Sequence, residues 1–277
     1  MSDTYDLIVI GAGAGGLVAS GFGGRVGLKV ALIERELLGG DCTHHGCVPS
    51  KSLLKIARDA HASRSSAKYG VHVSDVKVDI GQVKRHVQEI VQEIYQHETP
   101  EVFSEDYNVE VITGTATFKD EKTVVVNERE LIGKRIIIAT GARAMIPPIS
   151  GLSDVNYHTY RTIFDPEVVG EHLIVIGAGP IGMEMAQAHR RLGMQVTVID
   201  ENVLVRDEPE VARVMAGVFE REGVRFVQSL VSSVSQSGDV ISVTARNGEI
   251  VTGDVLLVVT GRAPNVDTLD LEKAGVN

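Results

Sequence analysis

The feature that most constrains this sequence is a glycine-rich motif that occurs twice. Residues 7–13 read LIVIGAG, and residues 173–179 repeat the same letters at an offset of 166 positions. Further pairs keep this offset: Gly16 and Gly182, Gly27 and Gly193, and Glu34 and Asp200. Chance does not produce such a repeat, so we expect the chain to contain two copies of one fold.

Each copy has the order of elements that a dinucleotide-binding turn requires. An apolar strand runs into glycines with G-x-G-x-x-G spacing, a helix follows, and a second apolar strand ends on an acid. The glycines permit a tight turn and the close approach of a pyrophosphate to a helix N-terminus, and the acid accepts hydrogen bonds from ribose hydroxyls. Duplication of the fold without two ligands is the alternative. The expected nucleotide-binding residues are Gly11, Gly13, Gly16 and Glu34 in the first copy, and Gly177, Gly179, Gly182 and Asp200 in the second.

The repeat predicts an α/β fold with two Rossmann-like dinucleotide-binding domains. Each copy closes with an apolar strand that runs into Thr-Gly, as IIIATG in the first and LLVVTG in the second. Before each closing strand, β-forming residues predict a small antiparallel meander. The expected meander strands are 109–112, 116–119 and 123–126 in the first copy, and 226–234, 240–246 and 250–252 in the second.

A proline-rich stretch separates the two copies. Pro147, Pro148 and Gly151 are typical of a linker, so the expected domains are residues 1–150 and 151–277. Within these domains, apolar spacing predicts helices over 17–26, 83–95 and 210–222.

Both cysteines of the chain, Cys42 and Cys47, lie in the segment GGDCTHHGCVPSK. In the first copy 106 positions separate Glu34 from Thr140 of the closing strand, whereas 60 separate Asp200 from Thr260 in the second. The cysteine segment lies in this extra sequence, so it is an insertion into the first nucleotide domain, within reach of a cofactor there. In a reducing cytosol, a close cysteine pair is more often redox-active than structural.

The residues that follow Cys47 predict a helix that starts just beyond it. The partial positive charge of a helix N-terminus and the nearby Lys51 make Cys47 the better candidate for a thiolate. Two alternatives are that the cysteines are small buried hydrophobic residues, or that they bind a metal with His44 and His45. No later cysteine exists and the other histidines are scattered, so no metal is expected.

Charge and hydropathy exclude several classes of protein. A net charge of −10 argues against nucleic acids and anionic membrane surfaces as partners, since both need clustered Lys and Arg. No secretory signal and no run long enough to span a membrane is recognisable. The sequence is therefore interpreted as a cytoplasmic globular protein.

Together these motifs resemble the class I pyridine nucleotide-disulfide oxidoreductases, which include dihydrolipoamide dehydrogenase, glutathione reductase and mercuric reductase. The resemblance rests on GGDCTHHGCVPSK, IIIATGAR, GAGPIGME and VVTGRAPN in that order, and it covers essentially the whole chain. It implies FAD on the first domain, NADH or NADPH on the second, and homodimers for full-length relatives, with a monomer left open for this length. The resemblance adds four residues to the expected cofactor contacts: Gly40, Thr140, Gly141 and Gly261.

The resemblance also implies roles in catalysis. Cys47 is the sulfur expected against the flavin, and Cys42 the sulfur expected to exchange with substrate. Lys51 and Glu184 match the pair that family members place beside the flavin N5 and the nicotinamide; a solvated surface pair is the alternative. The implied activity is transfer of electrons from NAD(P)H through flavin to the Cys42-Cys47 disulfide, and on to a small-molecule or protein disulfide or a similar acceptor.

Three departures from the family pattern stand out. The chain stops at Asn277, where relatives continue with a dimerisation domain that carries a His-Glu base, so a truncated nucleotide-binding module without turnover is the alternative function. The pair His44-His45 stands where relatives more often have uncharged residues, and Pro180 where some have tyrosine.

The acid of the second copy indicates which pyridine nucleotide binds. Asp200, reinforced by Glu201, should accept hydrogen bonds from a ribose diol and repel a 2′-phosphate. NADH is therefore favoured, while Arg206 keeps NADPH open. The acceptor substrate is not determined by these residues.

Overall fold

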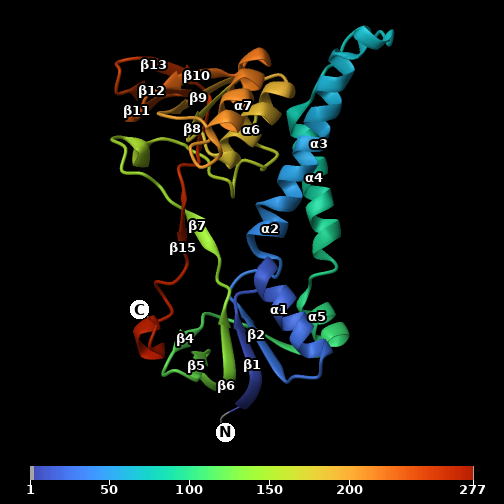
Figure 1. The fold of residues 1–277 in the computed structure, drawn as a ribbon, viewed down its shortest axis with the longest axis vertical. Coiled ribbons are helices and arrows are strands. Elements are labelled where there is room, and N and C mark those ends of the chain that lie inside the picture. Colours follow the sequence, from blue (N-terminus) through green and yellow to red (C-terminus); the bar gives the residue numbers. More distant parts are fainter. Residues whose placement is uncertain (1–2, 277) are drawn as a thin grey trace. The chain divides into compact units, whose positions relative to one another are not determined.

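The computed structural model describes residues 3–276 (Figure 1). They form two compact units, each made of separate stretches of chain. The first unit takes in the chain through Val48, then Ile90–Arg143, and the chain again from Ala263. The second comprises Pro49–Glu89 and Ala144–Arg262. The units therefore differ from the two continuous ranges, 1–150 and 151–277, that the linker predicted.

The first unit is built on a six-stranded sheet of order β3-β2-β1-β6-β5-β4. Strands β3, β2, β1 and β6 are parallel, and β5 and β4 continue the sheet antiparallel. The strands are β1 (Asp3–Ile10), β2 (Val30–Glu34), β3 (Val109–Thr113), β4 (Thr117–Phe118), β5 (Thr123–Val126) and β6 (Arg129–Ile138).

One strand assignment from the sequence was wrong. Residues 109–112, expected in the antiparallel meander, form β3, which pairs parallel to β2 with Val109 opposite Val30. The meander instead contains β4, β5 and the first half of β6, whose second half is the closing parallel strand. The pattern of β-forming residues marks a strand but does not say which neighbour it joins.

Helices α1 (Ala14–Arg25), α2 (Gly40–His44) and α5 (Pro100–Tyr107) complete this unit, with α1 and α5 on one side of the sheet (Figure 1). Leu17 of α1 and Phe103 of α5 belong to the same buried cluster. Close approach of these helices explains a glycine in α1, because a Cβ at Gly24 would lie 1.9 Å from the Tyr107 carbonyl oxygen.

The opposite face of the sheet is covered in part by the chain that follows Ala263. Leu269 is 2 % exposed and packs with Ile8, Phe118 and other core residues of the sheet. Its carbonyl accepts a hydrogen bond of 2.9 Å from the Phe118 amide. The hydrophobic core of the first unit is therefore finished by a segment distant in sequence.

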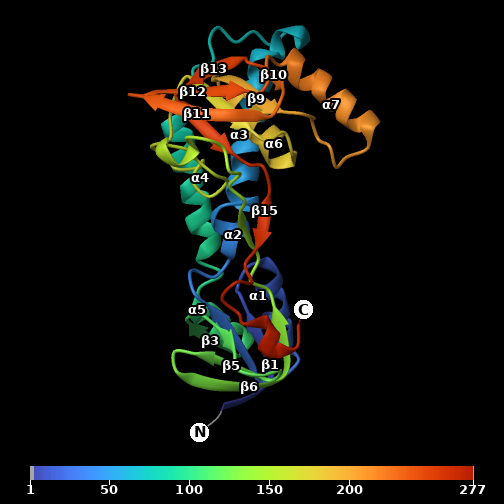
Figure 2. The ribbon, with the colours of Figure 1, turned by 90° about the vertical axis from the view of Figure 1, so that its left-hand side faces the viewer.

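The second unit contains a parallel four-stranded sheet of order β10-β9-β8-β14, with helices α6 (Pro180–Arg191) and α7 (Pro209–Arg221). A separate three-stranded antiparallel sheet, β11-β12-β13, lies next to it (Figure 2). The predicted strand 226–234 is in fact two strands, one in each sheet. The strand bounds are β8 (His172–Ile176), β9 (Gln195–Asp200), β10 (Arg225–Gln228), β14 (Val255–Val258), β11 (Val231–Ser237), β12 (Val240–Ala245) and β13 (Ile250–Gly253).

Two long helices follow the cysteine segment, α3 (Cys47–Arg64) and α4 (Ile80–Tyr95). They lie side by side in both views (Figures 1 and 2). Helix α3 begins at Cys47 itself rather than beyond it. The remaining elements are the two-stranded sheet of β7 (Ala142–Ala144) and β15 (Arg262–Pro264) and short 3-10 helices at Ser66–Tyr69, Leu152–Asp154 and Leu271–Ala274.

Between residues 3 and 276, none of the helices combines the length and apolar character needed to cross a bilayer.

Candidate active site

The first glycine turn is held together by backbone contacts that leave no room for side chains. Gly11 has φ +99°, and a Cβ there would lie 2.4 Å from the Ala139 carbonyl oxygen. A Cβ at Gly16 would lie 1.8 Å from the Gly11 carbonyl oxygen. Both residues must be glycine for strand β1 to pass directly into α1 beside β6.

Gly13 needs a different explanation. Its backbone is extended, with φ −73° and ψ −173°, and a Cβ at this position would meet nothing within 4 Å. The protein itself therefore does not require glycine there, and the open space lies at the N-terminus of α1. No side chain caps this helix and its first turn carries no acid, so its N–H groups suit a phosphate anion.

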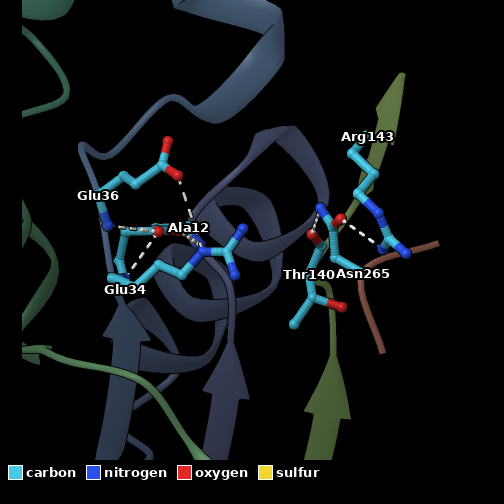
Figure 3. Close-up of polar contacts among 7 residues, drawn as sticks. Ala12, Glu34, Glu36, Thr140, Arg143 and Asn265 are labelled. Carbon is cyan, nitrogen blue, oxygen red and sulfur yellow. Dashed lines mark hydrogen bonds and ion pairs between the residues drawn. The ribbon is translucent and has the colours of Figure 1, made fainter. Parts of the chain in front are cut away.

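Glu34 is fixed beside this turn by three backbone N–H groups (Figure 3). One carboxylate oxygen, Oε2, accepts a hydrogen bond of 2.7 Å from Ala12 N. The other, Oε1, accepts from Arg35 N at 2.7 Å and from Glu36 N at 2.9 Å. The acid is thus held at the carboxyl end of β2, with lone-pair capacity left for a ribose hydroxyl.

The second glycine turn repeats this geometry. Gly177 has φ +113°, and a Cβ at Gly182 would lie 2.0 Å from the Gly177 carbonyl oxygen. Gly179 again has open space around a virtual Cβ, at the start of α6. Asp200 accepts hydrogen bonds of 2.7 Å from Ala178 N and from Glu201 N. Both turns therefore have the same packing glycines, open glycine and fixed acid.

The cysteine segment is attached directly to the first glycine turn. Gly39 N donates a hydrogen bond of 2.9 Å to Ala12 O, and Gly39 forms a parallel bridge with Gly13. Gly40 has φ +56°, and a Cβ there would lie 2.8 Å from Gly13 Cα. Helix α2, which carries Cys42, begins at Gly40. The Gly39-Gly40 pair therefore lets the sulfur-bearing chain contact the nucleotide turn.

The two cysteines are not joined by a disulfide, and their side chains interact with one another. Cys42 is half-buried and Cys47 is exposed. Burial first, then a side-chain hydrogen bond with Cys47 and the negative charges of Cys47 and Glu98, raises the pKa of Cys42 to about 11. Cys47 is the first residue of the 18-residue helix α3, whose first turn carries no acid. Burial therefore disfavours a negative charge on Cys42.

Comparisons with known proteins give the family. The model of the pyridine nucleotide-disulphide oxidoreductase family matches residues 5–277. The chain belongs to this family. Oxidoreductases of this kind use FAD and NAD(P)H.

Relatives in this family include several reductases. The chain is 36% identical to mercuric reductase of Lysinibacillus sphaericus over 280 residues, which are 99% of this chain and 51% of the relative. It is 35% identical to glutathione reductase of a Nostoc species, covering all of this chain and 61% of that protein. The chain thus spans about half the length of the mercuric reductases it matches.

A solved structure agrees with this assignment. The HOCl-induced flavoprotein disulfide reductase RclA of Escherichia coli superposes with a TM-score of 0.84 at 26% identity, over 99% of this chain and 60% of that one. The same protein has also been solved as a Cu(II) complex, which superposes with a TM-score of 0.83 at 26% identity over 98% of this chain and 60% of that one.

Within this oxidoreductase fold, the predicted site residues fall into two groups. The first unit contains Gly11, Gly13, Gly16, Glu34, Gly40, Cys42, Cys47, Thr140 and Gly141. The second contains Lys51, Gly177, Gly179, Gly182, Glu184, Asp200 and Gly261. The structure brings each glycine turn together with its acid, and the first turn with the two cysteines.

Lys51 and Glu184 are not joined in the part of the chain that the structure describes, since neither an ion pair nor a hydrogen bond links their side chains. Lys51 is an exposed residue of α3 and Glu184 a half-buried residue of α6. Gly261 packs closely, because a Cβ there would lie 2.7 Å from Met145 Cε. The roles that the family motif predicts for these residues stay predictions.

The sequence did not predict a role for Asn265 and Arg143. Asn265 Nδ2 donates a hydrogen bond of 3.0 Å to Thr140 O (Figure 3). Its backbone N–H donates to Gly141 O at 3.0 Å. Arg143 Nη1 donates to Asn265 Oδ1 at 3.4 Å. These contacts fix the turn that ends β6. The motif VVTGRAPN, which contains Asn265, marked this residue in the sequence. The motif did not indicate that Asn265 would contact the turn after β6.

His44 has a structural contact that bears on its role. Its Nε2 donates a hydrogen bond of 2.7 Å to Leu38 O, and its ring lies edge-on to Tyr95 at 5.1 Å. The ring thus ties the end of α2 back to the chain before Gly39. Among residues 3–276, no group of three or more His, Cys, Asp or Glu side chains is arranged to hold a metal ion.

Proposed function

We propose that this chain is the nucleotide-binding and dithiol-bearing part of an FAD-dependent oxidoreductase that passes electrons from NAD(P)H to a disulfide or similar acceptor. The observation that carries the proposal is the contact of Gly39 and Gly40 with Gly13, which holds the cysteine segment at a nucleotide turn. A redox dithiol needs this proximity to exchange electrons with a bound cofactor.

The first unit offers a fitting place for FAD. Gly13 leaves space at the uncapped start of α1 for a pyrophosphate, and Glu34 is fixed for a ribose. Bound flavin supplies two-electron exchange between a nicotinamide and a neighbouring sulfur pair. Gly40, Thr140 and Gly141 complete the set of first-unit residues that we assign to this cofactor.

The second unit offers the corresponding place for the pyridine nucleotide, at Gly177, Gly179 and Gly182. We assign Asp200 to the adenosine ribose, because its carboxylate keeps acceptor capacity after its two backbone hydrogen bonds. A carboxylate there repels a 2′-phosphate, so NADH is preferred over NADPH. Gly261 belongs to this proposed set as well.

The chemistry of the chain's own residues follows from their positions. Cys42 holds its proton in the reduced pair and gives it up when its sulfur attacks the acceptor. Cys47 lies at the start of α3, whose first turn carries no acid. Lys51 and Glu184 stay proposed as the catalytic pair that the family motif predicts.

A disulfide, on a small molecule or a protein, is the acceptor that a dithiol of this kind takes by thiol exchange. Mercuric ion as substrate is a second candidate, because relatives named mercuric reductase match at up to 36% identity. We place the protein in a reducing cytosol, where such a pair cycles between thiol and disulfide. A homodimer, which the family resemblance implies for full-length relatives, and a monomer of this length both stay proposals.

The alternative function is a nucleotide-binding module without turnover. A flavin titration of the purified protein separates the two, followed by anaerobic addition of NADH. We expect uptake of FAD and, after reduction, a long-wavelength absorbance band that is lost in Cys47→Ser. Protein that stays colourless with excess FAD contradicts the oxidoreductase. Protein that binds FAD but shows no band with NADH supports the module.

A further inference from the structure

The strongest unassigned feature near the dithiol is the carboxylate of Glu98. This half-buried residue lies between α4 and α5, and its Oε2 accepts a hydrogen bond of 2.6 Å from Thr43 Oγ1. Thr43 directly follows Cys42 on α2 and is 3 % exposed. A buried threonine hydroxyl thus holds an acid against the turn that carries the exchanging sulfur.

The backbone is shaped to admit this carboxylate. A Cβ at Gly39 would lie 2.6 Å from Glu98 Oε2 and 2.8 Å from Thr43 Oγ1. Gly39 also has φ +94°, a conformation that side chains disfavour. The glycine that joins the cysteine segment to the nucleotide turn therefore also makes room for Glu98.

The end of α4 is joined to α2 a second time. Tyr95 receives the edge of the His44 ring at 5.1 Å, one residue along from the Thr43 contact. Glu98 N donates to Tyr95 O at 2.9 Å, which fixes the carboxylate-bearing residue to the same turn. Two adjacent residues of α2 are thus held by one short stretch of chain, 95–98.

We propose that Glu98, held by Thr43, is a positioning residue for the dithiol: its negative charge adds to the effect of burial and so helps to keep the proton of the reduced pair on Cys42. This rests on the proposed redox function. Reduction of the disulfide by two electrons from NAD(P)H breaks the S–S bond and takes up one proton. The products are the Cys42 thiol and the Cys47 thiolate.

Other titratable groups also lie near Cys42. Asp41 and His44 share α2 with Cys42, His45 follows on the turn, and Cys47 begins α3. Burial is the largest cause of the raised pKa of Cys42, followed by Cys47 and then Glu98. Of these causes, the Glu98 charge is the one that a substitution removes without changing either sulfur.

The test measures alkylation of Cys42 by iodoacetamide as a function of pH, in a Cys47→Ser background, with peptide mass spectrometry. Glu98→Gln removes the charge but keeps an oxygen that accepts from Thr43. We expect its pH midpoint to fall by about half a unit to one unit, which is roughly a threefold to tenfold faster reaction below the midpoint. Glu98→Asp, which keeps the charge, should retain most of the raised midpoint.

Glu93→Gln is the matched control, because it removes one charge from an exposed residue of α4. We expect no shift from it. Thr43→Val keeps the Glu98 carboxylate but removes the hydroxyl that donates a hydrogen bond to it. We expect a smaller shift of the pH midpoint from this variant than from Glu98→Gln. The proposal is overturned if Glu98→Gln leaves the midpoint unchanged or if Glu93→Gln moves it equally.

Thermal unfolding checks that each variant folds. If Glu98→Gln does not fold, Glu98→Asp is compared with Thr43→Val instead. Equal pH midpoints for Cys42 alkylation in these two variants would then contradict the proposal. Alkylation needs neither cofactor nor acceptor. A failure to bind FAD would therefore reject the proposed redox function without altering this measurement.

Discussion

The two glycine turns close in the same way, but the chain continues differently after each. After each strand-ending acid the chain returns to the alanine of the glycine turn, with Gly39 N donating to Ala12 O and Leu204 N to Ala178 O, both at 2.9 Å. Both returning residues have positive φ, +94° for Gly39 and +50° for Leu204. In the second copy the Leu204 side chain is buried in the core.

This difference shows that the same backbone connection can have two different structural roles. Leucine at the return point contributes a buried side chain and pays with a strained conformation. Glycine contributes no packing, but it lets Glu98 and the next residue, Gly40, approach the turn. The first copy therefore gives up a core contact where the second keeps one, and it gains the position of the dithiol.

The largest effect is expected where both copies are alike. Gly16→Ala and Gly182→Ala each place a Cβ within about 2 Å of a carbonyl oxygen in the same turn. We expect each to lower the free energy of unfolding by on the order of 3 kcal/mol, because the turn must open. Urea unfolding measures this. Similar stability to the unsubstituted protein would show that the turns tolerate movement.

The second prediction concerns buried basic side chains, which differ between the two units. The second unit buries Lys84 and His189, whereas the described residues of the first unit include no buried lysine or histidine. Burial, and then the Lys84 charge, lowers the pKa of His189 to about 3. The unfolded chain, with an ordinary pKa near 6.5, binds the proton first, so stability is lost as pH falls from 6.5 towards 3.

A His189→Leu variant should lack this acid sensitivity. Between pH 7 and pH 4.5, we expect the free energy of unfolding of the unsubstituted protein to fall by on the order of 3 kcal/mol more than that of the variant. Unfolding in urea at several pH values measures the two slopes. Parallel slopes would mean that His189 is protonated as easily in the folded state as in the unfolded state.

The third prediction separates the two turns by ligand. Gly13→Ala and Gly179→Ala introduce a Cβ into open space, so neither should change stability. We expect about tenfold to 100-fold weaker binding of FAD for the first and of NADH for the second, since the methyl group occupies the space left for a pyrophosphate. Titration with each nucleotide distinguishes them. Equal weakening of both nucleotides in either variant would argue against one nucleotide per turn.

The smallest effect is expected at the acid of the second copy. Asp200→Asn keeps an oxygen that accepts from Ala178 N but removes the charge. We expect the preference for NADH over NADPH to fall by about tenfold, because repulsion of a 2′-phosphate is lost. Dissociation constants for both nucleotides test this, with Glu34→Gln as the matched control in the first copy. An unchanged ratio would assign the selectivity to other residues.

The repeated motif predicted the positions of the glycine turns and of their acids, and apolar spacing predicted several helices, because both depend on short-range patterns in the sequence. The predicted helices 83–95 and 210–222 lie within α4 and close to α7. Strand partners were harder to predict. Residues 109–112 were placed in the wrong part of the sheet, since parallel and antiparallel edge strands have similar residues.

The sequence did not predict contacts between residues that lie far apart in the chain. Thr43 and Glu98 are 55 positions apart, and Arg143 and Asn265 are 122 apart. Their types are ordinary for surface residues, so no local pattern marks them. By contrast, the motif of the cysteine pair predicts a redox role for it, and the structure adds its attachment to Gly13.

The burial of Leu269 in the first sheet has a consequence for synthesis in the cell. A ribosome makes β1, β2 and β6 before it makes the second unit, and Leu269 emerges only after both. Until then one face of the early sheet has an apolar gap beside Phe118 and Ile8. The first unit to be translated is thus the last to be completed, and its nascent form exposes this apolar surface until the second unit has been made.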